Sequence, residues 1–287
     1  MQVQWYPGHM TKAKRAMKED MKLVDLVVEI LDARAPLSSR NPDIDELSGN
    51  KARLVLLNKA DLADAKANKI WEQYFLEQGC ITARVDARKR SDMKPVQNAV
   101  REACREKTER DRKRGIKNRP VRAMVVGIPN VGKSTFINSF AGRACAKTGN
   151  RPGVTRGNQW IRLSKEVELL DTPGILWPKF EDEQVGIKLA LLGSVKDEIL
   201  GMEELSLELL GRLEERYPET LELRYQLTEA ERKEGPVHML TEIARFRNCV
   251  LKGNELDLEK AARLVIDDFR SGRLGAITLE LPDQEQG

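Results

Sequence analysis

The chain has 287 residues, of which 40% are hydrophobic, 33% charged and 5% aromatic. This length suffices for two domains, and the composition excludes a mainly disordered chain. No run reaches the 18 apolar residues of a membrane-spanning helix, and the start, MQVQWYPGHM, lacks the apolar region of a signal peptide. The four cysteines form no CxxC pair, which argues against a disulfide framework or a zinc site. We therefore expect a cytoplasmic protein that does not bind membranes.

Charge divides the chain into two parts. Residues 1–180 carry 35 Lys and Arg against 21 Asp and Glu, a net charge of +14. Residues 181–287 carry 14 against 24, a net charge of −10. This change predicts one domain over 1–180 and a second over 181–287, with the basic part as the better candidate for binding nucleic acid. A solvated surface is the alternative for both parts.

Strands and helices alternate in the first part. Residues 10–22 are predicted to form a basic amphipathic helix, because methionines and alanine recur there at helical spacing. Strands are predicted at 24–31, 53–57, 81–85 and 121–126, a strand pair at 159–163 and 167–170, and helices at 65–78, 93–114 and 133–140. The alternation predicts an α/β fold with a mostly parallel sheet. After Pro178, long helical patterns interrupted by Gly201 and Pro218 predict a small all-helical domain.

A glycine-rich turn joins the strand at 121–126 to the helix at 133–140. Its sequence, GIPNVGKS, matches the pattern G-x-x-x-x-G-K-[ST], whose backbone N–H groups cradle phosphates. Lys133 is predicted to reach the β- and γ-phosphates, and the Ser134 hydroxyl to bind Mg²⁺. The residues predicted to bind phosphate here are Asn130, Val131, Gly132, Lys133, Ser134 and Thr135.

Two further segments extend the predicted phosphate site. The sequence DTPG follows the strand at 167–170, so that Asp171 would hold Mg²⁺ through water and the Gly174 N–H would contact the γ-phosphate. Thr155 lies between this segment and the glycine-rich turn, within RPGVTRG. It is the candidate switch threonine that closes on Mg²⁺ and the γ-phosphate.

The base is predicted to bind at the ends of two other strands. In NKAD, Asp61 can accept hydrogen bonds from guanine N1–H and its 2-amino group, which adenine does not offer. Asn58 and Lys59 would brace this loop and cover the ring. The triplet Asp86, Ala87 and Arg88 follows the next strand and fits the last guanine loop, with an ordinary strand-end turn as the alternative. The sequence thus predicts GTP and GDP as ligands.

The order of these motifs is unusual. In ordinary small GTPases the phosphate-binding turn precedes the guanine motif, whereas here Asp61 precedes Lys133. This order predicts a circularly permuted nucleotide-binding domain, which is tolerable when the original termini are neighbours. The segment after Gly174 then runs directly into the C-terminal helices, so a γ-phosphate-dependent movement there would reach them.

Together, WYPGHM, DARAP at residues 32–36, NKAD, GIPNVGKS, RPGVT and DTPG resemble the bacterial ribosome biogenesis GTPase A family nearly end to end. The resemblance implies a GTP-hydrolysing assembly factor for the large (50S) ribosomal subunit, bound in the GTP state and released on subunit-stimulated hydrolysis. It also implies a helical C-terminal domain that contacts rRNA. The charge of −10 there departs from that expectation and would require a local basic face, for which Arg245, Arg247, Lys252 and Arg263 are candidates.

The group that orients the attacking water is not obvious. Ras-type enzymes place a Gln after the DxxG motif, but this chain has Ile175 there. The family resemblance points to His9, which precedes the basic helix, while a surface histidine is the alternative from the residues alone. His238 is expected to be structural.

Asn130 is a candidate ligand for K⁺, with a turn-capping role as the alternative. Residues 101–122 contain 10 Lys and Arg and 4 Asp and Glu. This basic segment is predicted either to contact RNA phosphates or to be an ordinary solvated surface. We expect a monomer. Two other functions stay open: a signalling-type GTPase with a protein partner, and a GTP-binding RNA scaffold with little turnover.

Overall fold

The computed structural model describes residues 15, 17–116, 119–145, 159–162, 166–171, 182–195 and 201–282. The chain divides into two compact units, one formed by Met1–Glu181 with Glu280–Gly287 and the other by Asp182–Leu279. The second unit therefore lies, in sequence, between two parts of the first. Each unit is described below by itself.

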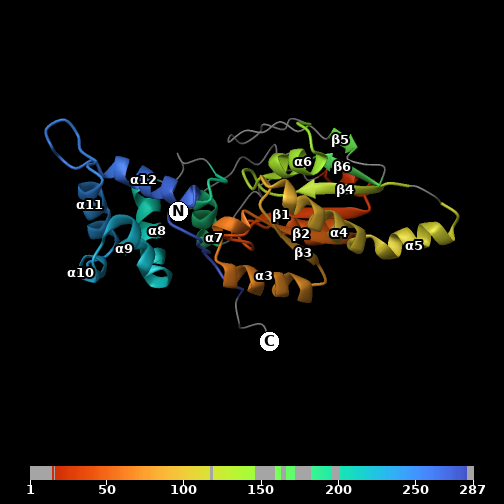
Figure 1. Cartoon of the computed structure of the whole chain (residues 1–287), viewed down its shortest axis with the longest axis horizontal. Coiled ribbons are helices and arrows are strands. Elements are labelled where there is room, and N and C mark those ends of the chain that lie inside the picture. Colours follow the sequence, from red (N-terminus) through yellow and green to blue (C-terminus); the bar gives the residue numbers. More distant parts are fainter. Residues whose placement is uncertain are drawn as a thin grey trace. The chain divides into compact units, whose positions relative to one another are not determined.

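The first unit is built on a six-stranded sheet (Figure 1). In chain order its strands are β1 (Leu26–Asp32), β2 (Ala52–Asn58), β3 (Ile81–Val85), β4 (Val121–Val126), β5 (Gln159–Arg162) and β6 (Val167–Asp171). Their order across the sheet is β3-β2-β1-β4-β6-β5, and all neighbours are parallel except β5 and β6. The predicted α/β fold with a mostly parallel sheet is thus confirmed.

The parallel register brings the carboxyl ends of the strands to one edge of the sheet. Asp32 at the end of β1 lies opposite Asn58 of β2, which in turn lies opposite Val85 of β3. On the other side of β1, Val125 of β4 lies opposite Asp171 of β6. The chain order reverses between β1 and β4, and such a reversal opens a crevice at the carboxyl edge of an α/β sheet.

Helices cover this sheet on both sides. The helices of the first unit are α2 (Asp43–Ser48), α3 (Ala65–Glu77), α4 (Met93–Ala103), α5 (Arg105–Lys113) and α6 (Lys133–Ala141), with short 3₁₀ turns η1 (Ala60–Leu62) and η2 (Arg90–Asp92). Figure 1 shows α3 and α6 on opposite sides of the sheet. Trp71 and Phe75 of α3 are fully buried against Leu31, Val55 and their neighbours.

The amino-terminal helix is described only in part. Residues 17–21 are helical, and Met17 and Met21 pack with Val27 and Met124 in a second buried cluster. The rest of the predicted helix over 10–22 lies outside the described residues.

The prediction of a single helix over residues 93–114 is wrong. The structure has two helices, α4 and α5, which meet at Cys104, where φ is −104° and ψ is 9°. Met93, Val96 and Val100 of α4 are buried, whereas α5 buries none of its residues. The charged segment after Cys104 therefore continues as a separate helix, α5, that has no buried apolar face. The interruption at Cys104 allows α5 to run in a different direction from α4.

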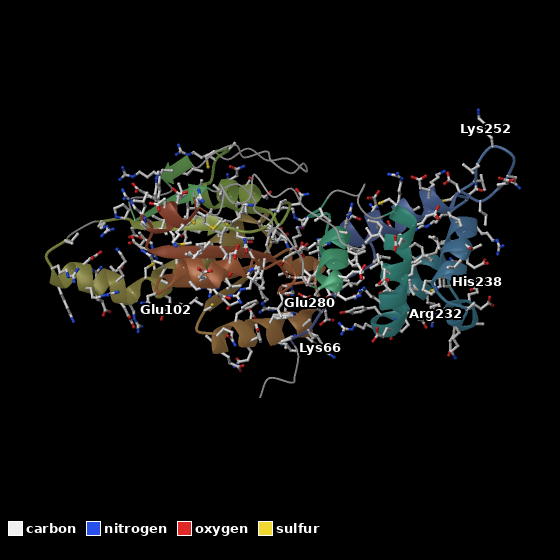
Figure 2. The ribbon with its side chains drawn as sticks, turned by 180° about the vertical axis from the view of Figure 1, so that it is seen from behind. Lys66, Glu102, Arg232, His238, Lys252 and Glu280 are labelled. Atoms are coloured by element: carbon white, nitrogen blue, oxygen red, sulfur yellow. The ribbon has the colours of Figure 1, made fainter. Side chains whose placement is uncertain are left out.

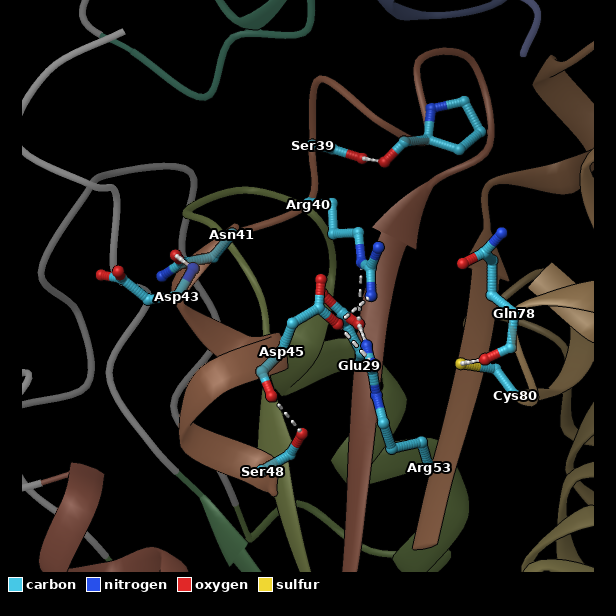
Figure 3. Close-up of polar contacts among 11 residues, drawn as sticks. Glu29, Ser39, Arg40, Asn41, Asp43, Asp45, Ser48, Arg53, Gln78 and Cys80 are labelled. Carbon is cyan, nitrogen blue, oxygen red and sulfur yellow. Dashed lines mark hydrogen bonds and ion pairs between the residues drawn. The ribbon is translucent and has the colours of Figure 1, made fainter. Parts of the chain in front are cut away.

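Buried charges connect β1, β2 and α2 within the first unit. Glu29 of β1 lies within 3.5 Å of Arg40 and 3.0 Å of Arg53, and both arginines also reach Asp45 of α2 (Figure 3). Burial raises the pKa of Glu29, and the two arginines oppose this only in part. The cluster fixes the segment between β1 and α2 through Arg40.

The second unit is helical. Its helices are α7 (Glu183–Leu191), α8 (Met202–Arg216), α9 (Pro218–Tyr225), α10 (Glu229–Lys233), α11 (Pro236–Phe246) and α12 (Leu258–Arg270). Leucines of α8 form its core with apolar side chains of α11 and α12. Asp257 caps α12, and Thr228 with Glu231 forms a capping box on α10. Among the described residues, no helix is long and apolar enough to cross a membrane.

Candidate functional site

Two glycines shape the turn after β4. Gly127 has φ 155°, and a Cβ there would lie 2.6 Å from the carbonyl oxygen of Ile30. Gly132 has φ 101°, and a Cβ there would lie 2.3 Å from Nδ2 of Asn58. Both positions thus demand glycine for conformation and for space, because a side chain would collide with neighbouring groups. The turn is held close to the strands beside it.

Lys133 begins α6 directly after this turn. Its side chain is buried, and Nζ donates to the carbonyl oxygens of Gly127 at 3.0 Å and Ile128 at 3.3 Å. The ammonium group therefore lies inside the curve of the turn. Ser134 and Thr135 follow within the first turn of α6, where backbone N–H groups and the helix dipole favour an anion.

Asn58 joins three loops at the carboxyl edge of the sheet. Its Nδ2 donates to the carbonyl oxygen of Val131 at 2.7 Å, and its Oδ1 accepts from the N–H of Ala87 at 2.9 Å. The amide is 2% exposed, so both hydrogen bonds are shielded from water. One side chain thus links the end of β2 to the glycine-rich turn and to the loop after β3.

Lys59 makes a second link between the same loops. It adopts a left-handed conformation with φ 58°, and its Nζ donates to the carbonyl oxygen of Asn130 at 3.0 Å. The same Nζ lies 2.8 Å from Oδ2 of Asp32, at the end of β1. Asn130 is itself left-handed, with φ 61°. The lysine of NKAD is therefore held between a buried carboxylate and the glycine-rich turn after β4.

Asp32 is fully buried and forms ion pairs with two cationic side chains. The Arg34 guanidinium donates to both of its carboxylate oxygens, at 2.9 and 2.8 Å. Burial alone would raise the pKa of Asp32, but Arg34 and Lys59 outweigh it and lower the pKa below its ordinary value. The carboxylate stays ionised, which keeps it attractive to Lys59.

The loop after β3 places an arginine between two carboxylates. Arg88 donates through Nη2 to Asp61 at 2.7 Å, and through Nε and Nη2 to Asp86 at 2.9 and 3.0 Å. Hydrogen bonds from Arg88 hold the pKa of Asp86 below its ordinary value. The guanidinium is exposed, while the Asp61 side chain is one-quarter exposed. Arg88 therefore lies over the carboxylate that the sequence assigns to guanine.

The structure thus gathers most of the predicted site at one edge of the sheet, but not all. His9, Thr155, Gly174 and Ile175 lie outside the described residues. The backbone of Asp171 ends β6 beside β4, but its side chain is outside what is described. Within the described ranges, no cluster of three or more His, Cys, Asp or Glu side chains is placed to hold a metal ion.

Sequence reasoning missed the part played by Asp32. The motif DARAP contributed only to the family resemblance, although it places a carboxylate at the carboxyl end of a strand whose residues are all buried. A charged residue at the carboxyl end of a buried parallel strand is a signal for a site residue, because these ends converge. Its partner Lys59 lies at the end of the neighbouring strand.

His238 lies in the second unit. It sits on α11 with Nδ1 3.3 Å from Glu234 and Nε2 3.7 Å from Glu242 (Figure 2). Glu242 lies on the same helix, whereas Glu234 caps the end of α10.

Comparison with known proteins gives a consistent result. A family profile described as "50S ribosome-binding GTPase" matches residues 122–238. A Bacillus cereus protein named "Ribosome biogenesis GTPase A" is 48% identical over 99% of this chain and 95% of its own length. A Thermotoga maritima protein of the same name is 33% identical over 97% of this chain and 94% of its length.

Solved structures agree with the sequence relatives. A GDP-bound structure of YlqF superposes with a TM-score of 0.67 at 28% identity, covering 94% of this chain and 100% of the other. A GNP-bound YlqF structure from Thermotoga maritima has a TM-score of 0.65 at 29% identity, over 95% and 99%. With its phosphate and guanine motifs gathered at one edge of the sheet and relatives matching it over nearly its whole length, the chain is a GTPase that belongs to the ribosome biogenesis GTPase A family.

Proposed function

We propose that this GTPase is an assembly factor for the large ribosomal subunit, which it binds in its GTP state and leaves after subunit-stimulated hydrolysis. The match of residues 122–238 to the profile of 50S ribosome-binding GTPases supports this most directly. Full-length relatives named for ribosome biogenesis support the same assignment. The protein would then work in the cytoplasm, as a monomer between encounters with the subunit.

The guanine base is proposed to bind over NKAD and the loop after β3. Asp61 accepts hydrogen bonds from guanine N1–H and the 2-amino group, and Arg88 must then leave that carboxylate or share it. Asp86 offers Arg88 an alternative partner, because it already accepts two hydrogen bonds from the guanidinium. Asn58 and Lys59 keep this loop against the phosphate-binding turn, and Ala87 completes its wall.

The phosphates are proposed to bind at the N-terminus of α6. The N–H groups of residues 130–135 surround them, and Lys133 turns from the carbonyl oxygens of its own turn to the β- and γ-phosphates. Ser134 lies in the first turn of α6, and Asp171 ends the strand beside β4, so both oxygen donors come from the same edge of the sheet. This donor set fits Mg²⁺, with Thr155 as a third ligand. Mg²⁺ would neutralise charge on the phosphates.

Two further groups are proposed to assist hydrolysis. His9 orients the attacking water, since Ile175 stands at the position of the Ras-type Gln and has no polar atom for that task. Asn130 contributes to a K⁺ site beside the phosphates, where a second cation would stabilise developing charge. The Gly174 N–H contacts the γ-phosphate.

RNA is proposed to bind along α5. Arg110, Arg112, Lys113 and Arg114 are exposed, and none of the four has an ion-pair partner among the residues that the structure describes. Cations left without carboxylates are free to neutralise phosphates, and their release of counterions would make binding salt-dependent.

The acidic second unit offers fewer cations. Arg245 is paired with Glu242 and Arg263 with Glu259, each along its own helix. Arg247 lies 5.7 Å from the ring of Tyr225 and near Asp268. Lys252, on the loop between α11 and α12, is exposed and remains the clearest candidate for rRNA in this unit (Figure 2).

Single-turnover GTP hydrolysis tests the proposal. The protein is assayed with purified large subunits, with small subunits and alone, in K⁺ and in Na⁺, with His9→Ala beside the wild type. We expect stimulation by the large subunit only, and its loss in His9→Ala while GTP binding survives.

No stimulation by either subunit would contradict the ribosomal assignment and favour a protein partner. Binding to rRNA without stimulated turnover would favour a GTP-binding scaffold. Stimulation that survives His9→Ala would place the water-orienting group elsewhere.

A further inference from the structure

Glu280 belongs to the first unit although it directly follows the second. The N–H of Ser38 donates to its Oε1 at 2.8 Å, and the Ser38 hydroxyl donates to its Oε2. The indole N–H of Trp71 donates to the backbone oxygen of Glu280 at 3.1 Å. Figure 2 shows Glu280 beside α3, the helix that carries Trp71. The segment after β1 and α3 together hold this residue.

These contacts are shielded from water because the residues that make them are buried. Glu280 is 7% exposed, Ser38 2% and Trp71 fully buried. A carboxylate is costly to bury unless its oxygens accept hydrogen bonds, and here both do. Loss of the Glu280 carboxylate would leave the Ser38 N–H and hydroxyl without their acceptors, so the segment after β1 would lose a fixed point, while the indole bond to the backbone oxygen would remain.

The segment over residues 33–41 is fixed at its other positions too. The Ser39 hydroxyl accepts from the N–H of Asp32 at 3.0 Å and donates to the carbonyl oxygen of Pro36 at 3.2 Å. Arg40 reaches the buried Glu29, and Figure 3 shows Ser39 and Arg40 on this segment. Ser38 lies between Asp32 and Arg40, so a shift at Ser38 bears on both.

Asp32 carries the connection into the nucleotide site. Its carboxylate lies 2.8 Å from Lys59 Nζ, and Lys59 donates onward to the carbonyl oxygen of Asn130 in the phosphate-binding turn. Every step from Glu280 to Asn130 is therefore a hydrogen bond, an ion pair or a short stretch of fixed backbone. Lys59 must hold one position to cover the base and brace the turn.

We propose that Glu280 is a positioning residue of the nucleotide site: by holding Ser38 it fixes the 33–41 segment, which keeps Asp32 against Lys59. The inference deepens the proposed function, because it rests on the guanine-binding role given to Lys59.

Glu280 directly follows the last residue of the second unit. Within the second unit, the Tyr217 hydroxyl accepts from the N–H of Thr278 and donates to its carbonyl oxygen. Only Leu279 separates Thr278 from Glu280, so the chain has little slack between the two anchored residues. Thr278 is thus anchored within the second unit and Glu280 within the first, two positions apart in the chain.

The experiment measures the dissociation rate of a fluorescent GDP analogue from the full-length protein. Glu280→Ala is expected to raise this rate about tenfold, which corresponds to about 1.4 kcal/mol. Glu280→Gln should fall between it and the wild type, because the amide keeps one acceptor oxygen for Ser38. Glu259→Ala removes an exposed helix-surface carboxylate and serves as the matched control, with no expected change.

A double-mutant cycle separates positioning from plain stability. In a Lys59→Ala background, Glu280→Ala should leave the GDP dissociation rate unchanged, because the route through Lys59 is already broken. Additive effects, or a normal rate in Glu280→Ala, would overturn the inference. If Glu280→Ala does not fold, Ser38→Ala removes the hydroxyl contact alone and tests the same step.

Failure of the underlying assignment gives a different result. If Lys59→Ala alone leaves GDP dissociation unchanged, the guanine-binding role of Lys59 is wrong, whatever Glu280 does.

Discussion

The two edges of the central sheet use charge in opposite ways. At the carboxyl edge, Asp32, Asn58 and Asp86 are buried, and each makes hydrogen bonds or ion pairs with the loops there. At the amino edge, a hollow is lined by Lys51, Arg53, Arg119 and the side chains of α4 and α5. Four of its cations, Arg105, Arg110, Arg114 and Arg119, are exposed.

This difference matches two kinds of ligand. Buried, mutually paired groups allow only one geometry, which suits a small molecule read atom by atom. Exposed cations on a helix without an apolar face impose no single geometry, which suits a phosphate backbone. The comparison therefore supports a nucleotide site at one edge of the sheet and the proposed polyanion surface at the other.

The largest effect is expected from Lys133→Ala at the carboxyl edge. The substitution removes the charge proposed to meet the β- and γ-phosphates, so single-turnover GTP hydrolysis should fall by about 10²–10³. Lys66→Ala, which removes an exposed lysine of α3, is the control and should hydrolyse GTP at the wild-type rate. A near-normal rate in Lys133→Ala would break the assignment of this edge to nucleotide.

Asp61→Asn tests whether the same edge reads guanine. The amide offers a donor where guanine N1–H needs an acceptor, so affinity for GDP should fall by about 100-fold or more while affinity for xanthosine diphosphate rises. Fluorescence titration with both nucleotides measures the exchange of preference, and Asp267→Asn, on the exposed side of α12, is the control. An equal loss for both nucleotides would indicate a disturbed loop and not base reading.

Asp32→Asn tests the buried charge at the carboxyl edge through the pH dependence of the free energy of unfolding. The pKa of Asp32 is lowered in the folded protein, so its ionised form stabilises the fold above its unfolded pKa, and this contribution is lost as pH falls through the folded value. At pH 7 the substitution should lower the free energy of unfolding by about 3 kcal/mol, because it leaves Arg34 and Lys59 with a neutral partner. Denaturant unfolding should show the gap to wild type narrowing below about pH 4.

The control for Asp32 is Asp45→Asn, at a half-exposed ion pair with Arg40 and Arg53. Its cost should be smaller than that of Asp32→Asn at pH 7. A gap between wild type and Asp32→Asn that stays constant from neutral to acid would argue that packing, not ionisation, accounts for the loss.

The smallest effect is expected at the amino edge. Changing Arg110, Arg112, Lys113 and Arg114 together to Gln should weaken binding to purified large-subunit rRNA by about tenfold and reduce the salt slope by about 3. GDP affinity should not change, because the ion pairs of α5 among the described residues involve none of the nucleotide motifs. A matched variant that changes the exposed Lys66, Lys69, Arg216 and Lys260 to Gln removes the same charge and should keep most of the slope if α5 is the main surface.

Local patterns predicted much of the fold. The strands at 81–85 and 121–126 have the bounds that the sequence predicts, because apolar β-branched runs end there in turn residues. The nucleotide motifs follow the carboxyl ends of the strands, so the parallel pairing of the strands brings these motifs together at one edge. The break at Cys104 was not predictable, since the charged pattern continues through it and only the loss of packing partners marks the end of α4.

Other features depend on distant parts of the chain. Glu29 lies within an apolar run of the sequence, and nothing near it in the sequence predicts its ion pairs with Arg40 and Arg53. Arg88 was predicted to lie near the base, but its ion pair with Asp61 depends on the side-chain geometry of two separate loops. Glu280 meets Ser38 across 242 positions, and no local pattern points from one to the other.

The return of Glu280 to the first unit also bears on how the protein is made. A chain emerges from the ribosome from its amino end, and its early domains generally fold first. Here Ser38 is synthesised early, but its buried partner is one of the last described residues to appear. The nucleotide unit therefore cannot reach its final packing around residues 33–41 until the helical unit has been synthesised. A truncated chain would keep every nucleotide motif and still lack the contact that completes the unit.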